Sequence, residues 1–207
     1  MATRNPPAGD TAQMHELLYQ VLETELGGVK IYETALKCAV NNDLRKEFTH
    51  YLAQTREHVE VATGMLESFG LDPNAMTPGR KVVGHIGHSL VSAMEMALAA
   101  GDPTAAELVA CECVVLAETK DHTNWELVGK CAEALTGEEQ RVLKAGYDRV
   151  EDQEDHHLYH TKGWCRELWL KSLGLGAVLP PPEEVLKVAT AIGAARAEQS
   201  RDEMRKQ

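Results

Sequence analysis

The chain has 207 residues and a mass of 22.7 kDa, which is enough for one well-buried domain with extensions and does not require a second domain. Hydrophobic residues make up 43% of the sequence and charged residues 26%, which is ordinary for a folded protein and argues against disorder across the body of the chain. The formal net charge of -11 argues against electrostatic capture of nucleic acid and favours cations, including metal ions, as partners.

The beginning of the chain is predicted to be a loose arm, because residues 1–10 contain two prolines and a glycine. This arm lacks the apolar centre of a signal peptide, and no stretch approaches the roughly 20 apolar residues that span a bilayer. We therefore expect no membrane partner and a cytoplasmic location. The five cysteines include no Cys-x-x-Cys pair, so reduced, mostly buried thiols are expected rather than a disulfide framework or a zinc ribbon.

Two long helices are predicted in the first half of the chain. The first begins near residue 11, and its apolar side chains recur three or four positions apart, which places them on one face. The polar run from Asn41 to Asp43 interrupts it, and Asp43 is the expected N-cap of the second helix. That helix is predicted to end near Phe69, because Gly70 follows.

The second half is predicted to contain two more long helices and an appended one. Strand signals are nearly absent, so the expected fold class is all-α. In chain order we predict a turn-rich connector at 72–80, a shorter apolar segment at 81–100, long helices at about 104–135 and 137–173, a linker at 174–182 and an amphipathic helix within 183–207.

Residues 11–173 thus have the order of a four-helix bundle in which one long crossover makes both helix pairs antiparallel. The final helix could pack on this bundle or on a partner subunit. A purely structural bundle has similar patterning, so the periodicity alone does not decide the function.

Charged and histidine side chains on the apolar faces are the informative deviation, because burying such groups is unfavourable unless something compensates. Each long helix offers at least one of them: Glu25, His58, Glu118, Glu154 and His157. Glu154 and His157 stand three apart, so they project from one helix face and can converge on one ion. The sequence therefore predicts a carboxylate and histidine metal site inside the bundle.

A second regularity relates the two halves of the chain. Glu25 is followed seven residues later by Tyr32, and Glu118 is followed seven residues later by Trp125. The next helix of each half then brings a histidine, so the halves look like variants of one helical hairpin. Tyr32 and Trp125 are expected to serve in core packing rather than as redox relays.

Other residues with ligand spacing are weaker candidates. His156 and His160, four apart, could clamp a metal on the outside of the fourth long helix, but a solvated pair is favoured. His122, one turn after Glu118, is a candidate additional ligand. A second Glu-x-x-His match is expected to belong to a solvated polar stripe made of Glu47, His50, Gln54 and Glu57.

At these residues the sequence resembles the ferritin-like di-iron superfamily. The stretch from Glu25 to Tyr32 is similar to its first-helix motif, a ligand glutamate with an aromatic residue seven positions on. The segment 54–60 resembles its second-helix Glu-Glu-x-x-His motif, and Glu154-x-x-His157 resembles its fourth-helix motif. Within the superfamily, the segment from Leu44 to Pro73 is also similar to the bacterial stress-associated YciF-like group.

This resemblance, over about residues 14–170, implies a ferritin-like four-helix bundle with a crossover helix between its second and third helices and an additional C-terminal helix. It implies two iron or manganese ions per chain, held by Glu25, His58, Glu118, Glu154 and His157. One position departs from the pattern, because Thr55 stands where a metal-binding glutamate is expected. A hydroxyl does not offset cationic charge as a carboxylate does, so one ion could be bound weakly or not at all. Glu57 or Glu60 could replace it only if the second helix were rotated.

The predicted function is a non-haem di-iron or di-manganese protein that reacts with O2 or peroxide, of the oxidase, peroxidase or ferroxidase type, in an oxidative-stress response. A homo-oligomer, such as a dimer, is expected. The alternative is a stress-associated structural or assembly bundle with a degraded or single-metal site. Iron storage in a symmetric shell is a third, less favoured possibility. Hydrolase and nucleotide-dependent functions are set aside, because no nucleophile elbow, phosphate-binding loop or dinucleotide fingerprint occurs in the sequence.

Overall fold

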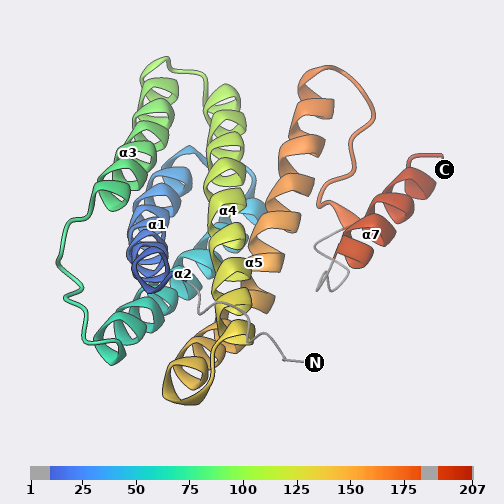
Figure 1. Cartoon of the computed structure of the whole chain (residues 1–207). Coiled ribbons are helices and arrows are strands. Elements are labelled where there is room, and N and C mark those ends of the chain that lie inside the picture. Colours follow the sequence, from blue (N-terminus) through green and yellow to red (C-terminus); the bar gives the residue numbers. More distant parts are fainter. Residues whose placement is uncertain (1–9, 183–190, 207) are drawn as a thin grey trace.

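The computed structural model describes residues 10–182 and 191–206, and within these ranges the chain is all-α, without a strand. The beginning of the predicted C-terminal helix, at 183–190, lies outside the described residues. The helices are α1 (Thr11–Cys38), α2 (Asn42–Ser68), α3 (Pro78–Ala99), α4 (Pro103–Ala134), α5 (Gly137–Ser172) and α7 (Ala191–Met204) (Figure 1).

The helix boundaries follow from local capping. Asn41, and not the predicted Asp43, is the N-cap of α2, because its side chain accepts hydrogen bonds from the backbone N–H groups of Asp43 (2.8 Å) and Leu44 (3.3 Å). Asp43 stands instead in the first turn, where a carboxylate interacts favourably with the helix dipole. At the other end of α2, Gly70 has a φ of 68°, a conformation that glycine adopts without steric strain.

The four longest helices, α1, α2, α4 and α5, pack side by side. α1 contacts α2 and α4, and α5 contacts α4 and α2. α3 follows α2 and lies against α1 and α4 at the outside of the group (Figure 1).

Two apolar clusters form the core, and each draws side chains from all four of these helices. We call them the Phe48 cluster, which includes Ile31, Phe48, Val114 and Trp164, and the Leu18 cluster, which includes Leu18, Leu66, Trp125 and Leu143. Along the chain, α1 and α5 pass from the Leu18 cluster to the Phe48 cluster, and α2 and α4 pass the other way. The contacting helices are therefore antiparallel, and the predicted ligands lie between the two clusters.

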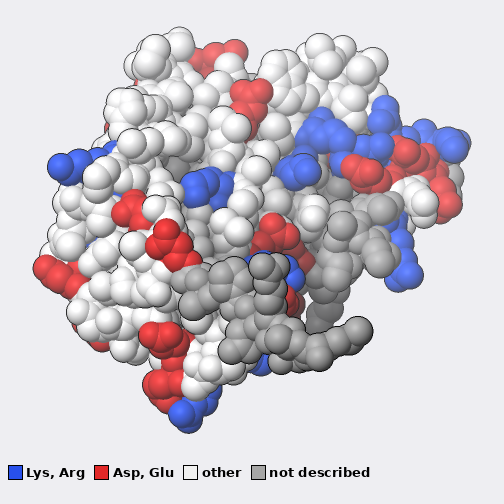
Figure 2. All heavy atoms as spheres, in the orientation of Figure 1, with Lys and Arg blue, Asp and Glu red and all other residues white. Residues whose placement is uncertain are grey.

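α3 is mostly unburied. It is long and apolar enough, by length and composition only, to cross a membrane, contrary to the expectation that no stretch approaches that limit. Its glycine, serine and histidine residues interrupt the apolar pattern without adding much charge, which explains the difference. Val82, Ile86 and Met96 are exposed, and Figure 2 shows few charged side chains over α3.

α7 lies beside the C-terminal end of α5. Two ion pairs join the helices, between Arg166 and Glu198 (3.3 Å) and between Arg201 and the buried Glu167 (3.7 Å). Charged side chains of both signs gather over α7 in Figure 2. The described part of the C-terminal helix thus contacts the chain's own α5.

Candidate metal centre

All five ligands predicted from the sequence meet in the interior of the protein. They come from α1, α2, α4 and α5, and they are almost fully excluded from solvent: Glu25 (0% exposed), His58 (1%), Glu118 (3%), Glu154 (1%) and His157 (0%). Acidic side chains are almost never buried to this extent unless they are paired or bind a cation. That these residues bind a metal stays a prediction.

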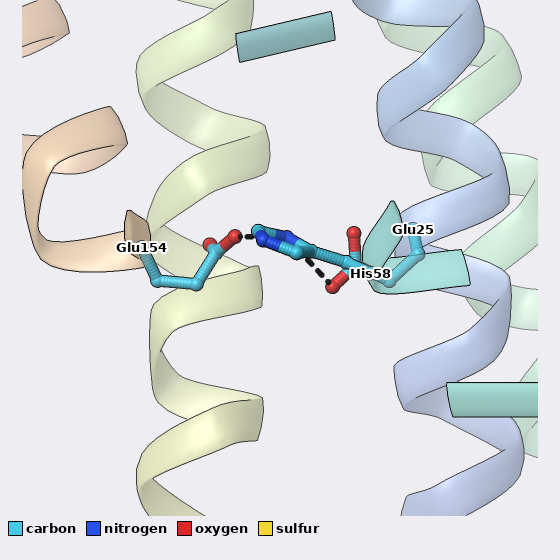
Figure 3. A group of neighbouring side chains, drawn as sticks. All are labelled: Glu25, His58 and Glu154. Carbon is cyan, nitrogen blue, oxygen red and sulfur yellow. Dashed lines mark ion pairs between the residues drawn. The ribbon is translucent and has the colours of Figure 1, made fainter. Parts of the chain in front are cut away.

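The five residues form two overlapping groups that share Glu154. In the first group, His58 Nδ1 lies 2.9 Å from Glu154 Oε1 and 3.6 Å from Glu25 Oε1 (Figure 3). In the second, His157 Nδ1 lies 3.4 Å from the same Glu154 oxygen and 3.5 Å from Glu118 Oε2. Glu154 therefore contacts the imidazoles of both groups.

Several atoms that could act as ligands in this cluster have no hydrogen-bond partner. They are Glu25 Oε2, Glu118 Oε2, Glu154 Oε2, His58 Nδ1 and His157 Nδ1. A buried polar atom without a partner destabilises a fold by about 1–3 kcal/mol. The three carboxylate oxygens have no partner, and the two Nδ1 atoms have carboxylate oxygens beside them without hydrogen-bond geometry, which is compatible with a bound cation that would satisfy all five.

Each imidazole is hydrogen-bonded through its Nε2 atom to an amide side chain. His58 Nε2 lies 2.8 Å from Gln153 Oε1, and His157 Nε2 lies 3.0 Å from Gln54 Oε1. An amide oxygen only accepts hydrogen bonds, so each Nε2 carries a proton and Nδ1 is the nitrogen that would bind a metal after losing its own proton. Neither glutamine was predicted to contact the site, although each stands four residues before the histidine of its own helix.

The paired glutamates and aromatics found in the sequence also have a structural explanation. The Tyr32 hydroxyl donates to Glu118 Oε1 (2.7 Å), and the indole N–H of Trp125 donates to Glu25 Oε1 (2.7 Å). Each aromatic residue thus orients the glutamate of the opposite half. Both are fully buried, so the expected packing role is correct but incomplete.

Thr55 supplies no ligand to the cluster. Its hydroxyl donates to the Tyr51 carbonyl (2.9 Å), and its methyl group packs so close to Gly28 that a Cβ there would lie only 3.1 Å away. Glu57 and Glu60, the suggested substitutes, are not in the cluster, since Glu57 is exposed towards Arg149 (3.8 Å) and Glu60 is also exposed. The structure therefore has no carboxylate in place of the glutamate that the resemblance leads one to expect at Thr55.

A further buried carboxylate, Asp121, was missed in the sequence. It is 4% exposed, stands three residues after Glu118 on α4, and its Oδ1 has no partner. Burial raises its pKa well above the usual value, and the nearby carboxylates of Glu25 and Glu154 raise it further. The three-residue spacing from Glu118 is the signal that could have identified it.

The electrostatics of the cluster favour protonated imidazoles beside an ionised Glu154. Burial alone would lower the pKa of both histidines, but the neighbouring carboxylates raise it to about 11 for His58 and about 9 for His157. Burial would raise the pKa of Glu154, but the two imidazoles lower it to about 2. Burial raises the pKa of Glu25 to about 7. In the metal-free protein the imidazoles therefore hold protons that a bound cation would displace.

Carboxylate oxygens and imidazole nitrogens are ligands that suit iron, manganese and related divalent ions. No protein-family model, curated protein or solved structure matches this chain.

The weaker candidates lie outside this cluster. His122 binds Asp155 (2.8 Å) instead of serving as an additional ligand beside Glu118. Two expectations of solvent exposure are wrong: Glu47 is largely buried and bonded to Trp164 (2.7 Å), and His160 is only 8% exposed. Exposure was expected because both residues lie on the polar edges of their helices. In the structure, α2 and α5 pack against each other along these edges.

Proposed function

We propose that this chain is a ferritin-like di-metal carboxylate protein that binds two iron or manganese ions and reacts with O2 or peroxide, as an oxidase, peroxidase or ferroxidase. One observation carries the proposal. Two groups of glutamate and histidine share Glu154 in the interior, and their unpartnered ligand atoms face one another.

The arrangement of the helices supports the ferritin-like part of the proposal. Two antiparallel pairs, α1 with α2 and α4 with α5, are joined by a connection that includes α3. Every one of the four long helices contributes at least one of the buried ligands. In ferritin-like bundles the metal ligands likewise project inward from all four helices.

The donor set favours iron or manganese. The two groups contain carboxylates and imidazoles and no thiolate, whereas structural zinc sites and copper(I) sites commonly use cysteine. Asp121, buried near the two groups, would bring the carboxylates to four, which would offset the charge of two divalent cations despite Thr55.

Bound redox-active ions would supply electron exchange with O2 or peroxide. The chain's own residues prepare the site for that chemistry. Gln54 and Gln153 fix the tautomers of the imidazoles, and Tyr32 and Trp125 fix the orientation of two glutamates. The apolar clusters on both sides exclude bulk water, which strengthens the electrostatic interactions inside.

Elemental analysis of protein purified without chelators tests the proposal. We expect about two iron or manganese ions per chain, lost in Glu118→Ala and Glu154→Ala while circular dichroism shows retained helicity. Anaerobically loaded Fe²⁺ protein should then be oxidised on mixing with O2 or peroxide. Absence of metal after reconstitution would favour the structural-bundle alternative, and one ion per chain would favour the single-metal form that Thr55 suggests.

A further inference from the structure

A polar pocket lies between α2 and α5, on the solvent side of the candidate metal centre. It has a volume of about 440 Å³. Its lining combines imidazoles, carboxylates and amides: Glu47, His50, Tyr51, Gln54, Asp152, Gln153, His156 and His160. Two motifs noted in the sequence, Glu47-x-x-His50 and the pair His156 and His160, therefore line the same cavity.

The pocket reaches both imidazoles of the buried cluster. Gln54 and Gln153, which accept hydrogen bonds from His157 and His58, form part of its wall. The Tyr51 ring, also in the wall, lies 4.2 Å from the His157 ring, measured between centroids. Since the cluster itself is closed to solvent, an ion needs a route inward, and this pocket is separated from the cluster by single side chains.

His160 has the geometry of a prepared metal ligand. Its Nδ1 lies 3.0 Å from Glu47 Oε1, an oxygen that accepts the ring proton, and 3.0 Å from the Tyr51 hydroxyl. The residue is 8% exposed, and its Nε2 is buried without a partner. A carboxylate on one ring nitrogen and a free lone pair on the other is the arrangement that orients metal-binding histidines.

A second imidazole lies on the same face of α5. His156 stands four residues before His160, so the two side chains are neighbours along the helix. His156 donates its Nδ1 proton to the Asp152 carbonyl (2.6 Å), which leaves Nε2 available. The ring centroids of His156 and His160 are 5.2 Å apart.

We propose that this pocket is a second, outer metal site, at which Nε2 of His156 and His160 hold a divalent transition-metal ion, with water completing its coordination, before it passes to the buried cluster. The proposal rests on the proposed function for the passage of the ion, but not for its binding. Imidazole-rich sites prefer divalent ions of the iron to zinc series over magnesium or calcium, and the acidic chain attracts such cations.

Binding at the pocket can be measured with Co²⁺, whose visible absorption changes when imidazole replaces water. In Glu154→Gln, which disables the buried cluster, we expect one Co²⁺ per chain to remain bound and to be lost when His156→Ala is added. Absence of the remaining ion in the Glu154→Gln variant would overturn the proposal.

Uptake can be measured by stopped-flow absorption in the chain with an intact cluster. We expect His156→Ala to load the buried cluster about tenfold more slowly than the wild-type chain, with the same final number of ions inside. His88→Ala is the matched control, because His88 has the same bond from Nδ1 to a backbone carbonyl (Gly84, 2.6 Å) but lies on α3 outside the pocket. Loading of His156→Ala at the wild-type rate would overturn the proposal.

Failure of the proposed function would give a different result. The wild-type chain would then bind a single ion, which His156→Ala would lose and Glu154→Gln would keep. That outcome would support the outer site while removing the buried di-metal centre.

Discussion

The two helical hairpins, α1 with α2 and α4 with α5, use the same hydrogen-bonding plan but carry different charges. Each hairpin supplies a glutamate, an aromatic residue, a glutamine and a histidine to the interior, and each aromatic and glutamine bonds to a ligand of the other hairpin. The plan diverges at two positions. Thr55 in the first hairpin corresponds to Glu154 in the second, and Gly28 corresponds to Asp121.

The two hairpins thus share the hydrogen bonds that orient the candidate ligands but differ in the negative charge that they supply. Around the candidate metal centre, the second hairpin contributes the buried carboxylates of Glu118, Asp121 and Glu154, whereas the first contributes that of Glu25. Four carboxylates would offset the charge of the two divalent ions that we propose, although their distribution is uneven. Ligand orientation is therefore shared between the hairpins, while most of the negative charge resides in one of them.

The largest effect is expected from Glu154→Gln, because this residue contacts both imidazoles and the corresponding position of the first hairpin, Thr55, carries no carboxylate. We expect the affinity for both ions to fall by more than about 100-fold, measured by competition with a chelator of known affinity. Glu57→Gln, an exposed change on α2, is the control and should leave the affinity unchanged. Loss of only one ion in Glu154→Gln would contradict the shared role.

The pH dependence of metal binding is expected to be the next largest effect. Since the pKa of His157 is raised to about 9 and that of His58 to about 11, both rings are protonated at neutral pH without metal. Each ion must displace one of these protons, so affinity increases as pH rises and decreases as it falls. Between pH 6 and 8 we expect an increase of about 100-fold for each ion, by the same competition measurement. A constant affinity over this range would show that the imidazoles are not ligands.

Asp121→Asn tests whether the second hairpin compensates for Thr55. We expect the affinity for one ion to fall by about 10- to 100-fold. The metal-free protein should become more stable by about 1 kcal/mol, because a buried carboxylate with a raised pKa is removed. Calorimetry with and without metal measures both effects. Asp155→Asn is the control, since Asp155 is also buried but pairs with His122 away from the cluster.

The smallest effect is expected when one hydrogen bond that joins the two hairpins is removed. Gln54→Leu is expected to weaken metal binding by about tenfold through His157, on the opposite hairpin. Double-mutant cycles of metal affinity should therefore show coupling between Gln54→Leu and His157→Ala and near-additivity with His58→Ala. The reverse pattern, with coupling to His58, would mean that glutamine acts within its own helix.

The sequence predicts those features that depend on a single helix. The periodicity of α1 and α5 places Glu25, Glu154 and His157 on inward faces, and the structure buries all three. Contacts across the bundle depend instead on the rotation and axial offset of two helices, which the pattern of either helix does not contain. Gln54 and Glu47, at the polar edge of α2, therefore look solvated in the sequence, although α5 covers them.

The position of the polar cluster between two apolar clusters has a consequence for assembly. If one helix slid by a turn, about 5.4 Å, its carboxylate or imidazole would be placed against leucine and tryptophan side chains. Slipped alignments of the four helices are thereby penalised far more strongly than an all-apolar interior would penalise them. The residues that could hold metal thus also favour one axial alignment of the four helices during folding.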